Sequence, residues 1–447
     1  MSRLFGTDGI RAPFGQEPLD RATVAALGRA LGEELCERSC SPVVVLAGDT
    51  RSSTPILAAW LAEGLFEHGV AVRFAGVLPT PAVAALVPRL GAACGIAVSA
   101  SHNLPPDNGI KLIDAAGFKW APEREAALEK RLLALRRQRP SLTGEPPALT
   151  IDPDLAELYR RQLLGHFSAD QPLSGLSIAL DAAHGAASGL AADLFSALGA
   201  TVRLLHAEPD GTNINLHCGS THPEALAAVV RDGHDLGIAF DGDADRAILV
   251  DEHGQVRDGD AILYLWATAL RREGSLSPPA IVATTMSNLG LERALAREGI
   301  AVERCNVGDR EVVARLQQEG LLLGGEQSGH VVHLGLATTG DGLLTGLAMA
   351  VLRAREGRPL SALLEGFQRF PQVLENVRVR RKQDLTTLPP VVAAMDRAER
   401  SLGQEGRLVV RFSGTEPLAR VMIEGPDAGE IAALAAGIVT AIKETLG

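Results

Sequence analysis

Residues 43–51 read VVVLAGDTR, an apolar run that ends in a Gly-Asp turn. The same order of apolar run and polar turn returns in SIALDAAHG, LGIAFDGD and AIVATTMSN, which begin at residues 177, 236 and 280. Amphipathic helices are expected after three of these runs, at residues 54–68, 188–198 and 290–298. Continuous apolar strands that alternate with helices of about 10–15 residues are typical of βα units and a largely parallel sheet. The sequence therefore predicts an α/β protein built from several similar layers.

Three polar stretches divide the chain into segments. Residues 135–153 are rich in Arg and Pro, residues 251–258 form a polar turn after a strand, and residues 369–388 lead through prolines into the last part of the chain. That last part has the pattern strand, helix, strand, strand, helix, which indicates a smaller α+β domain. We therefore predict three similar mixed-sheet α/β domains and a C-terminal α+β domain, with the boundaries 1–150, 151–252, 253–368 and 369–447.

The composition restricts the classes of partner. The 447 residues include 43 basic and 54 acidic ones, a net charge of −11, and only 4% are aromatic. Such a chain is neither a general nucleic-acid binder nor a protein with aromatic platforms for single strands. The five cysteines form no Cys-x-x-Cys pair, and no stretch resembles a signal peptide or a membrane span. We therefore expect reduced thiols, a cytoplasmic location and no membrane partner. Only five of the basic residues are lysines, so Arg is the usual cation of this chain.

The first candidate site is SASHN at residues 99–103, which follows an apolar strand and precedes DNGIK at residues 107–111. A hydroxyl at the carboxyl end of a strand in an α/β sheet lies where such sheets bind ligands. Two prolines and Asn-Gly turn the chain back, so Lys111 should approach Ser101. Ser101 is therefore a candidate nucleophile, with His102 and Lys111 beside it. A capping serine in a loop is the alternative, and the absence of a Gly-x-Ser-x-Gly elbow argues against a hydrolase.

The second candidate site is DGDADR at residues 241–246, which also follows an apolar strand. Alternation along an extended segment would put Asp241, Asp243 and Asp245 on one side of the chain. Three neighbouring carboxylates repel one another, so a divalent cation such as Mg²⁺, or Ca²⁺ in a looser site, would stabilise them. An EF-hand is excluded because its sixth position is Arg246 instead of Gly. An acidic turn on the surface is the alternative.

Three further turns offer polar groups for a small anionic ligand. GGEQSGH at residues 324–330 combines a carboxylate, an amide and a hydroxyl, which suits a sugar. RFSGTEPLAR at residues 411–420 places hydroxyls and backbone N–H groups between two arginines, which suits phosphate. FGTDGIR at residues 5–11 ends in Arg11, which could reach a shared site. A Gly-rich hairpin, a solvated surface turn and a terminal hairpin are the respective alternatives.

Together, a serine nucleophile, a carboxylate cluster, a sugar-binding turn and a phosphate-binding turn indicate phosphoryl transfer on a phosphosugar. The sequence resembles the α-D-phosphohexomutase superfamily over essentially its whole length. The resemblance rests on FGTDGIR (5–11), SASHN (99–103), DNGIK (107–111), DGDADR (241–246), VGDR (307–310), GEQSGH (325–330), TTGDG (338–342) and SGTEPLARVMIEG (413–425). It implies four domains around a central cleft.

The resemblance also implies roles for the matching residues. Ser101 matches the phosphorylated serine, and its phosphate would complete a Mg²⁺ shell formed by Asp241, Asp243 and Asp245. The implied substrate-binding residues are Asp309, Glu326, Gln327 and Ser328 for the sugar, and Arg411, Ser413, Gly414, Thr415 and Arg420 for its non-reacting phosphate. The residues implied around the transferring phosphoryl group are Arg11, His102, Lys111, Arg246 and His330. Among these we favour Lys111 as general acid/base, because an amine can lose its proton whereas Arg stays charged.

Gln327 narrows the assignment within the superfamily, because glucose- and mannose-specific relatives resemble GEMSGH where this chain has GEQSGH. Gln327, the segment GSTHP at residues 219–223 and TTGDG favour glucosamine phosphate. The resemblance then implies an amino-sugar mutase that interconverts glucosamine 6-phosphate and glucosamine 1-phosphate through a phosphoserine enzyme. It implies one Mg²⁺ per active site and glucosamine 1,6-bisphosphate as intermediate and activator, and it is compatible with a homodimer. One departure is Leu104, where the superfamily usually has Pro after Ser-His-Asn.

Three alternatives stay open from the sequence alone. A phosphomannomutase or phosphoglucomutase of the same superfamily would carry out the same chemistry on another sugar. A non-catalytic phosphosugar-binding regulator would use the same scaffold, although it would need neither Ser101 nor Lys111. A serine-dependent phosphatase would release the phosphoryl group to water instead of returning it to the sugar.

Overall fold

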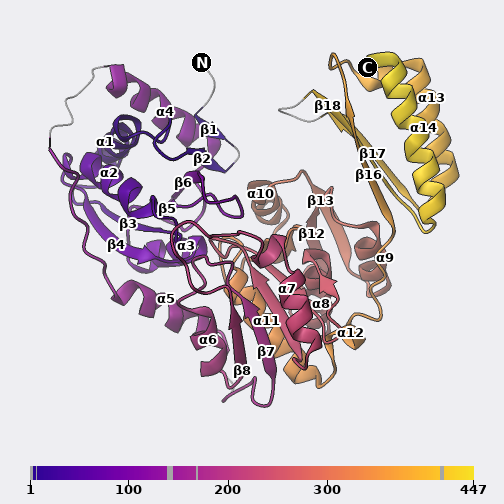
Figure 1. Cartoon of the computed structure of the whole chain (residues 1–447), viewed down its shortest axis with the longest axis horizontal. Coiled ribbons are helices and arrows are strands. Elements are labelled where there is room, and N and C mark those ends of the chain that lie inside the picture. Colours follow the sequence, from indigo (N-terminus) through magenta and orange to yellow (C-terminus); the bar gives the residue numbers. More distant parts are fainter. Residues whose placement is uncertain (1–3, 7, 138–143, 168–169, 413–416) are drawn as a thin grey trace. The chain divides into compact units, whose positions relative to one another are not determined.

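A computed structural model describes residues 4–6, 8–137, 144–167, 170–412 and 417–447 of the chain (Figure 1). The chain divides into two compact units. Unit 1 consists of Met1–Thr285 and Val302–Leu364, and unit 2 consists of Met286–Ala301 and Glu365–Gly447. Three sheets belong to unit 1 and one sheet belongs to unit 2.

The first sheet carries the N-terminal hairpin and the segment SASHN at residues 99–103, which we call the serine loop. Its order is β1-β2-β6-β5-β3-β4, with the bounds Phe5–Gly6, Gly9–Pro13, Asp107–Ile113, Cys94–Val98, Val43–Gly48 and Ala71–Val77. β3 is parallel to β4 and β5, whereas β6 runs antiparallel to β5 and β2. The sheet is therefore mixed, because the chain returns directly after the serine loop instead of through a crossover helix. This return confirms the predicted turn, and it pairs Lys111 with Ala97.

Four helices accompany the first sheet: α1 (Arg21–Arg38), α2 (Thr54–Phe66), α3 (Thr80–Arg89) and α4 (Pro122–Arg137). α1 and α2 approach each other very closely. A Cβ atom on Gly28 would lie 2.2 Å from the carbonyl oxygen of Leu61, and one on Gly64 would lie 2.2 Å from that of Ala25. Glycine is therefore required at both positions, because any side chain there would push the two helices apart.

The second sheet carries the segment DGDADR at residues 241–246, which we call the carboxylate loop. Its order is β11-β10-β9-β7-β8, with the bounds Val256–Arg257, Ala247–Val250, Leu236–Phe240, Ser177–Asp181 and Thr201–Leu205. β9 and β10 form an antiparallel hairpin whose turn is DGDADR, whereas β7 is parallel to β8 and β9. The neighbouring helices are α5 (Asp154–Gly165), α6 (Ala191–Ala197), α7 (Glu224–Arg231) and the short η1 (Gly219–Thr221).

The third sheet carries the GEQSGH turn at residues 325–330, which was predicted to bind a sugar. Its order is β13-β12-β14-β15, with the bounds Ala301–Cys305, Ala280–Thr284, Leu323–Gly325 and Val331–His333. β14 and β15 form an antiparallel hairpin, and GEQSGH makes its turn. The helices of this part are α8 (Gly259–Arg272), α10 (Asp309–Glu319), α11 (Gly342–Glu356) and α12 (Leu360–Leu363).

Unit 2 is an antiparallel sheet with helices. The strand order is β16-β18-β17, with the bounds Gln372–Arg378, Leu418–Glu424 and Arg407–Phe412. The helices are α9 (Leu289–Arg297), α13 (Pro389–Leu402), α14 (Ala428–Leu446) and the short η2 (Leu385–Thr387). Glu424 is fully buried and accepts hydrogen bonds from Asn288 Nδ2 at 3.0 Å and Arg407 Nε at 2.9 Å. These bonds connect residues 286–301 to the C-terminal sheet.

The predicted fold class is confirmed. The four apolar runs are the strands β3, β7, β9 and β12, and their residues are almost entirely buried. The expected helices are α2, α6 and α9, whose ends lie within a few residues of the predicted ones. Three mixed-sheet α/β layers and a smaller antiparallel C-terminal sheet are present, in the predicted order of elements. The expectation of largely parallel sheets is wrong, because each sheet of unit 1 combines parallel pairs with antiparallel ones, namely β5 with β6, β9 with β10 and β14 with β15.

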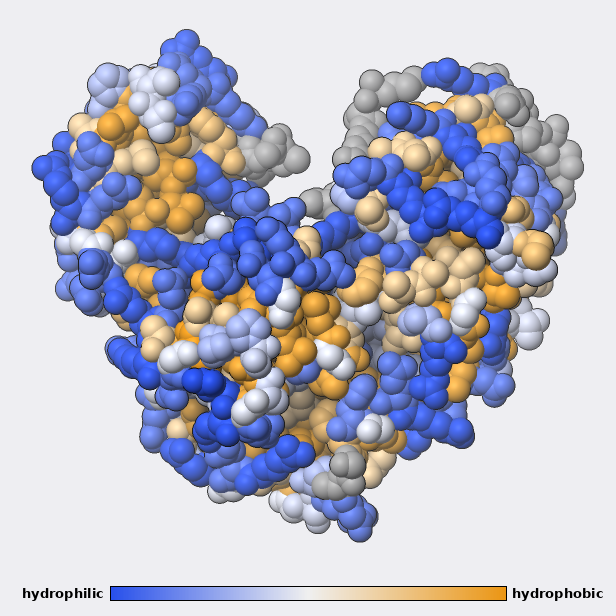
Figure 2. Space-filling model, turned by 180° about the vertical axis from the view of Figure 1, so that it is seen from behind, coloured by the Kyte–Doolittle hydropathy of each residue, from blue (hydrophilic) through white to orange (hydrophobic). Residues whose placement is uncertain are grey.

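The surface is mixed in character. Hydrophilic and hydrophobic residues are interspersed over the face drawn in Figure 2. None of the helices in the described ranges is both long and apolar enough to cross a membrane.

Candidate active site

The Ser101 loop follows β5 and is held in a strained conformation. Ser101 has a φ of 51°, in the left-handed region, and its side chain is buried. Its backbone N–H donates to Ser99 Oγ at 2.9 Å, and Ser99 Oγ donates to Asp49 Oδ2 at 2.6 Å. A non-glycine residue in this region costs about 1–3 kcal/mol and persists only where its surroundings enforce it, most often at functional sites.

A buried ion pair lies beneath this loop. Arg51 and Asp49 are almost fully buried and form a close contact. Arg51 Nη2 also donates to the carbonyl oxygen of Asn103 at 2.7 Å, and Asn215 Nδ2 donates to that of Ser101 at 2.8 Å. The sequence analysis did not select these supporting residues. For Asp49 and Arg51, the sequence feature that could have indicated them is the GDTR turn at the end of β3, because β3 is the neighbour of β5 in the sheet.

The three aspartates of DGDADR converge as predicted, but not by strand alternation. Asp241, Asp243 and Asp245 are buried, and one oxygen of each lies within 4.8 Å of the others. The segment is a turn between β9 and β10 instead of an extended chain, and Ala244 within it has a φ of 53°. The geometric reason given from the sequence is therefore wrong, because the turn brings the carboxylates together.

The cluster has the properties expected of a cation site. Asp243 Oδ1 and Asp245 Oδ1 are buried and have no hydrogen-bond partner in the described ranges. Burial raises the pKa of Asp241 well above its usual value, and the charges of Asp245 and Asp243 raise it further. An all-oxygen site with unpartnered carboxylate oxygens suits Mg²⁺. Ser101 Oγ donates to Asp241 Oδ2 at 2.6 Å, so the candidate nucleophile lies directly at this cluster.

Lys111 lies among the same carboxylates. Its Nζ is 2.8 Å from Asp243 Oδ2, 3.2 Å from Asp8 Oδ2 and 3.7 Å from Asp245 Oδ2, and the side chain is 1% exposed. Burial disfavours the charged ammonium, but the three carboxylates outweigh it and hold the pKa of Lys111 well above its usual value. The charged ammonium is thus the favoured form, whereas Lys111 was selected from the sequence because an amine can lose its proton.

His102 and Arg11 also lie close to the Ser101 loop. His102 Nδ1 is 3.5 Å from Ser101 Oγ. Burial lowers the pKa of His102 to about 4, with a further contribution from the positive charge of Arg246, so the imidazole is neutral at pH 7. Arg11 Nη1 donates to the carbonyl oxygen of Ala100 at 3.2 Å. The N-terminal segment is a hairpin, and it also delivers Arg11 to the serine loop.

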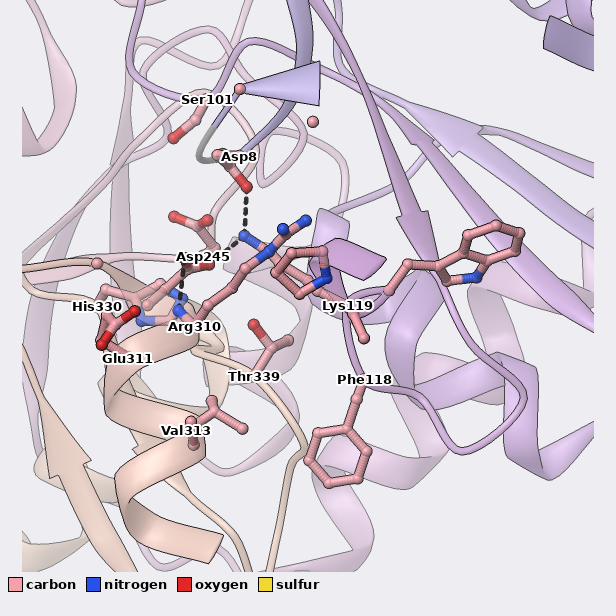
Figure 3. A pocket seen from close by; sticks show the side chains of 18 of the residues that line it. Asp8, Ser101, Phe118, Lys119, Asp245, Arg310, Glu311, Val313, His330 and Thr339 are labelled. Carbon is pink, nitrogen blue, oxygen red and sulfur yellow. Dashed lines mark hydrogen bonds and ion pairs between the residues drawn. The ribbon is translucent and has the colours of Figure 1, made fainter. Parts of the chain in front are cut away.

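A cavity of about 1260 Å³ opens beside Ser101. Of the residues predicted for the site, those that line it are Arg11, Ser101, His102, Asp245, Arg246, Asp309, Glu326 and His330. Figure 3 shows Asp8, Lys119 and Asp245 close together in this cavity, near Ser101. The five segments that contribute these predicted residues are far apart in the sequence, so unit 1 brings eight of the predicted residues into one pocket.

Lys119 is a site residue that the sequence analysis missed. Its ammonium contacts both Asp8 and Asp309, and its side chain is 9% exposed. The pKa of Lys119 is raised although burial opposes this, because the carboxylates of Asp309 and Asp8 favour its charge. The sequence feature that could have indicated Lys119 is its rarity, since it is one of only five lysines in a chain that otherwise uses Arg.

The GEQSGH turn presents polar groups without protein partners. Glu326 Oε1 accepts from the backbone N–H of Gly308 at 3.0 Å, which fixes this carboxylate. Buried polar atoms without a hydrogen-bond partner in the described ranges include Gln327 Nε2, Ser328 Oγ and both ring nitrogens of His330. Such atoms are costly to bury, so a polar ligand that paired with them would be stabilising.

The predicted phosphate-binding residues belong to unit 2. Arg411 on β17 and Arg420 on β18 are directly paired across the two strands. Both line a small cavity together with Met286, Leu374, Val409 and Met422. Ser413, Gly414 and Thr415 lie outside the described residues. Leu104, the departure noted in the serine loop, is 52% exposed.

Comparison with protein-family models covers nearly the whole chain. The models of the phosphoglucomutase/phosphomannomutase family match residues 2–139 with α/β/α domain I, 158–254 with α/β/α domain II, 258–370 with α/β/α domain III and 374–441 with the C-terminal domain.

Curated relatives match at full length. The phosphoglucosamine mutase of Solibacter usitatus is 44% identical over 445 residues, which cover 99% of each chain. That of Symbiobacterium thermophilum is 46% identical over 449 residues, which cover 100% of each chain.

Solved structures share the fold. A phosphoglucomutase/phosphomannomutase family protein from Burkholderia thailandensis has a TM-score of 0.79 at 27% identity, and the match covers 99% of this chain and 97% of that one. The N-acetylphosphoglucosamine mutase of Aspergillus fumigatus, solved with GlcNAc-6P and magnesium, has a TM-score of 0.66 at 17% identity over 99% and 95% of the two chains. The family models and the full-length relatives together show that the chain belongs to the phosphoglucomutase/phosphomannomutase superfamily.

Proposed function

We propose that this enzyme is a phosphoglucosamine mutase, which interconverts glucosamine 6-phosphate and glucosamine 1-phosphate. The observation that carries the proposal is the position of Ser101, whose hydroxyl lies 2.6 Å from Asp241 in a buried carboxylate cluster. This serine also lines a cavity of about 1260 Å³, which is large enough for a phosphosugar. The full-length relatives that carry this name support the choice of sugar.

In the proposed reaction, Ser101 carries a phosphoryl group. The C1 hydroxyl of glucosamine 6-phosphate attacks this phosphorus, so the bond from phosphorus to Ser101 Oγ breaks and a bond to the sugar oxygen forms. The product is glucosamine 1,6-bisphosphate. This intermediate turns over in the cleft, and its 6-phosphoryl group then moves to Ser101 Oγ, which leaves glucosamine 1-phosphate and restores the phosphorylated enzyme.

Proton transfer in each step needs an acceptor and a donor. The attacking hydroxyl must lose a proton, and the neutral His102 imidazole near Ser101 Oγ can accept one. Lys111 stays our proposed general acid/base, and its charged ammonium is suited to supply the proton that Ser101 Oγ takes up as it leaves. Arg11 and Arg246 would stabilise the transferring phosphoryl group by their charge.

The carboxylates of Asp241, Asp243 and Asp245 would hold one Mg²⁺, with the Ser101 phosphate as a further ligand. Bound there, Mg²⁺ would neutralise negative charge on the phosphoryl oxygens. The unpartnered oxygens of Asp243 and Asp245 support this assignment. The positive charge of Lys111 neutralises part of the negative charge of the carboxylates. One divalent cation and one lysine would therefore together balance the charge of three aspartates.

The remaining roles extend the same proposal. Asp309, Glu326, Gln327, Ser328 and His330 would contact the sugar or its transferring end, and Arg411, Ser413, Gly414, Thr415 and Arg420 would bind its other phosphate. The paired arginines of unit 2 support the latter role, because guanidinium groups bind phosphate with two hydrogen bonds. We keep the proposed domain boundaries 1–150, 151–252, 253–368 and 369–447. The free thiols of all five cysteines support a cytoplasmic location.

The sugar specificity is tested by comparing glucosamine 6-phosphate, glucose 6-phosphate and mannose 6-phosphate as substrates of the phosphorylated enzyme. We expect kcat/KM to be at least about tenfold higher for the amino sugar, since a pocket that pairs with a polar substituent rejects analogues that lack it. An equal or higher value for glucose or mannose phosphate would assign the chain to the other mutases of the superfamily.

The chemistry is tested separately by intact mass. Incubation with a sugar 1,6-bisphosphate should add one phosphoryl group to the wild-type chain and none to Ser101→Ala. No gain in mass by the wild-type chain would favour a non-catalytic regulator. Release of inorganic phosphate faster than isomerisation would instead identify a phosphatase.

A further inference from the structure

A second cluster of metal-binding side chains lies in the second sheet, apart from DGDADR. Asp181 is the last residue of β7, His206 directly follows β8, and Cys218 directly precedes η1. One donor atom of each lies within 4.8 Å of the others. From this juxtaposition we infer that Asp181, His206 and Cys218 form a binding site for a divalent transition metal of the zinc class.

The donor set separates this site from the aspartate cluster. Carboxylate oxygen, imidazole nitrogen and thiolate sulfur are together the ligands of Zn²⁺, at about 2.0–2.3 Å, whereas Mg²⁺ prefers oxygen alone. Asp181 and Cys218 are fully buried, and the side chain of His206 is 27% exposed. A cation can therefore arrive from solvent on the His206 side and be enclosed by the other two ligands.

The thiol of Cys218 is fully buried beside Asp181 and His206. It forms no hydrogen bond within the described ranges. When a sulfur–metal bond forms, the thiol proton leaves to solvent. His206 Nδ1 already lies 2.9 Å from Asp181 Oδ2, so carboxylate and imidazole are held together before the metal binds. Coordination through Nδ1 requires that His206 give up this hydrogen bond to Asp181 and carry its proton on the other ring nitrogen.

The backbone around the cluster is strained. Five of the eight non-glycine residues with positive φ in the described ranges surround it: Ala183, His184, His206, Asn215 and His217. Such conformations are unfavourable for non-glycine residues, persist only where the surrounding structure enforces them, and cluster at functional sites. The His184 ring lies 5.4 Å from the His206 ring, and its Nδ1 is buried without a hydrogen-bond partner in the described ranges. His184 is therefore the nearest candidate for a fourth ligand.

The position of the site gives it a supporting role. The segment that ends in Cys218 also contains Asn215, whose side chain donates to the carbonyl oxygen of Ser101 at 2.8 Å. The segment after Asp181 contacts the carboxylate loop, since the Ala186 N–H donates to the carbonyl oxygen of Gly242 at 2.8 Å. A metal bound by Asp181, His206 and Cys218 would join the two segments that support the serine loop and the carboxylate loop, without taking part in phosphoryl transfer.

The site is tested by titrating the metal-free protein with Co²⁺ in the presence of excess Mg²⁺. Thiolate coordination produces an intense charge-transfer absorption that an all-oxygen site cannot give. We expect this band in the wild-type protein and in Cys305→Ser, which removes another buried thiol, and we expect its loss in Cys218→Ser. Absence of the band in the wild type, or its persistence in Cys218→Ser, would overturn the assignment and leave only a hydrogen-bonded Asp181–His206 pair beside a buried thiol.

A competition experiment with a chromophoric chelator measures the affinity for Zn²⁺ alone. We expect Cys218→Ser and His206→Gln each to weaken binding at least about tenfold relative to wild type and Cys305→Ser, because even outer-shell changes have effects of that size. Equal affinities in all four proteins would overturn the proposal. Thermal melts without metal establish that each variant is folded, and because no step measures mutase activity, the result is independent of the proposed function.

Discussion

The serine loop and the carboxylate loop meet at one hydrogen bond, yet their polar groups are satisfied in opposite ways. The backbone N–H and carbonyl of Ser101 are both bonded to protein side chains, and the Asp49–Arg51 pair supports them from below. Across the contact, Asp243 and Asp245 each keep a buried oxygen without a partner in the described ranges. The first loop is completed by the protein, whereas the second is left for a ligand to complete. Substitutions beneath the serine loop should therefore cost stability, and substitutions in the carboxylate loop should cost function.

The largest effect is expected for Ser101→Ala. Removing the nucleophile should lower kcat by about 10⁴-fold or more, because covalent catalysis through this oxygen has no replacement. A coupled assay with glucosamine 1,6-bisphosphate supplied measures this. Ser52→Ala, an exposed neighbour of the supporting turn, should stay within about twofold of wild type. Activity of Ser101→Ala within tenfold of wild type would contradict the mechanism.

The next effect concerns stability beneath the serine loop. Arg51→Met should lower the free energy of unfolding by about 3–5 kcal/mol, because it leaves the buried carboxylate of Asp49 without its charge partner. Urea unfolding followed by circular dichroism measures the change. Arg315→Met breaks an exposed pair with Glu319 and should cost less than about 0.5 kcal/mol. Equal costs for the two variants would show that the serine loop does not depend on the buried pair.

Asp341 extends the comparison to a buried carboxylate that the protein does satisfy. It accepts from the Leu344 N–H at 2.9 Å and from the Tyr159 hydroxyl at 2.9 Å. Burial nevertheless raises its pKa to about 6 from 3.8, so the folded state binds the proton more tightly than the unfolded state. The resulting stabilisation is complete below about pH 3.8 and is lost as pH rises through 6.

The pKa shift of Asp341 sets the size of the expected change in stability and the pH range in which to measure it. A shift of this size corresponds to about 3 kcal/mol. The difference in unfolding free energy between wild type and Asp341→Asn should therefore change by roughly that amount between pH 4 and pH 7, in favour of the variant at the higher pH. Asn can still accept the capping hydrogen bond at the start of α11, so loss of the cap does not contribute to the difference between the variant and the wild type. A difference that does not vary with pH would mean that Asp341 titrates normally.

The smallest effect is expected for Asp241→Asn. It should be an increase in the free energy of unfolding, whereas Arg51→Met should lower it. Without divalent cations, Asp241→Asn should raise the free energy of unfolding by about 1 kcal/mol, because it removes one of three mutually repelling buried charges. Adding Mg²⁺ at a hundred times its Kd should stabilise the wild type by about 2.7 kcal/mol and the variant by much less. Thermal melts with and without Mg²⁺ measure both changes. Destabilisation of the metal-free variant would show that the carboxylate loop, like the serine loop, is satisfied by the protein.

The apolar strands were predictable because they form the centre of each sheet. β3, β7, β9 and β12 are buried on both faces, and this produces continuous apolar runs that sequence inspection detects. The antiparallel strands within these sheets were harder to predict. β6 and β10 return after short turns, and the polar residues in those turns indicated chemistry more clearly than strand direction.

Candidate site residues were predictable where a single turn holds the chemistry, as in SASHN and DGDADR. The supporting contacts were not, because they join residues that are distant in the sequence. Lys119 meets Asp8 and Asp309, which are separated from it by 111 and 190 positions. No local periodicity encodes such a pairing. The raised pKa of Lys111 could not be predicted for the same reason, since it depends on Asp8 and Asp243 from other segments.

The hydrogen bonds of Glu424 make unit 2 discontinuous in sequence. The chain enters this unit at Met286, leaves it after Ala301 and returns at Glu365. A gene fragment that began at residue 369 would encode the whole C-terminal sheet and yet omit Asn288, which supplies one of the donors to the buried Glu424. A C-terminal fragment of this kind would therefore leave the buried carboxylate of Glu424 without the donor that Met286–Ala301 supplies.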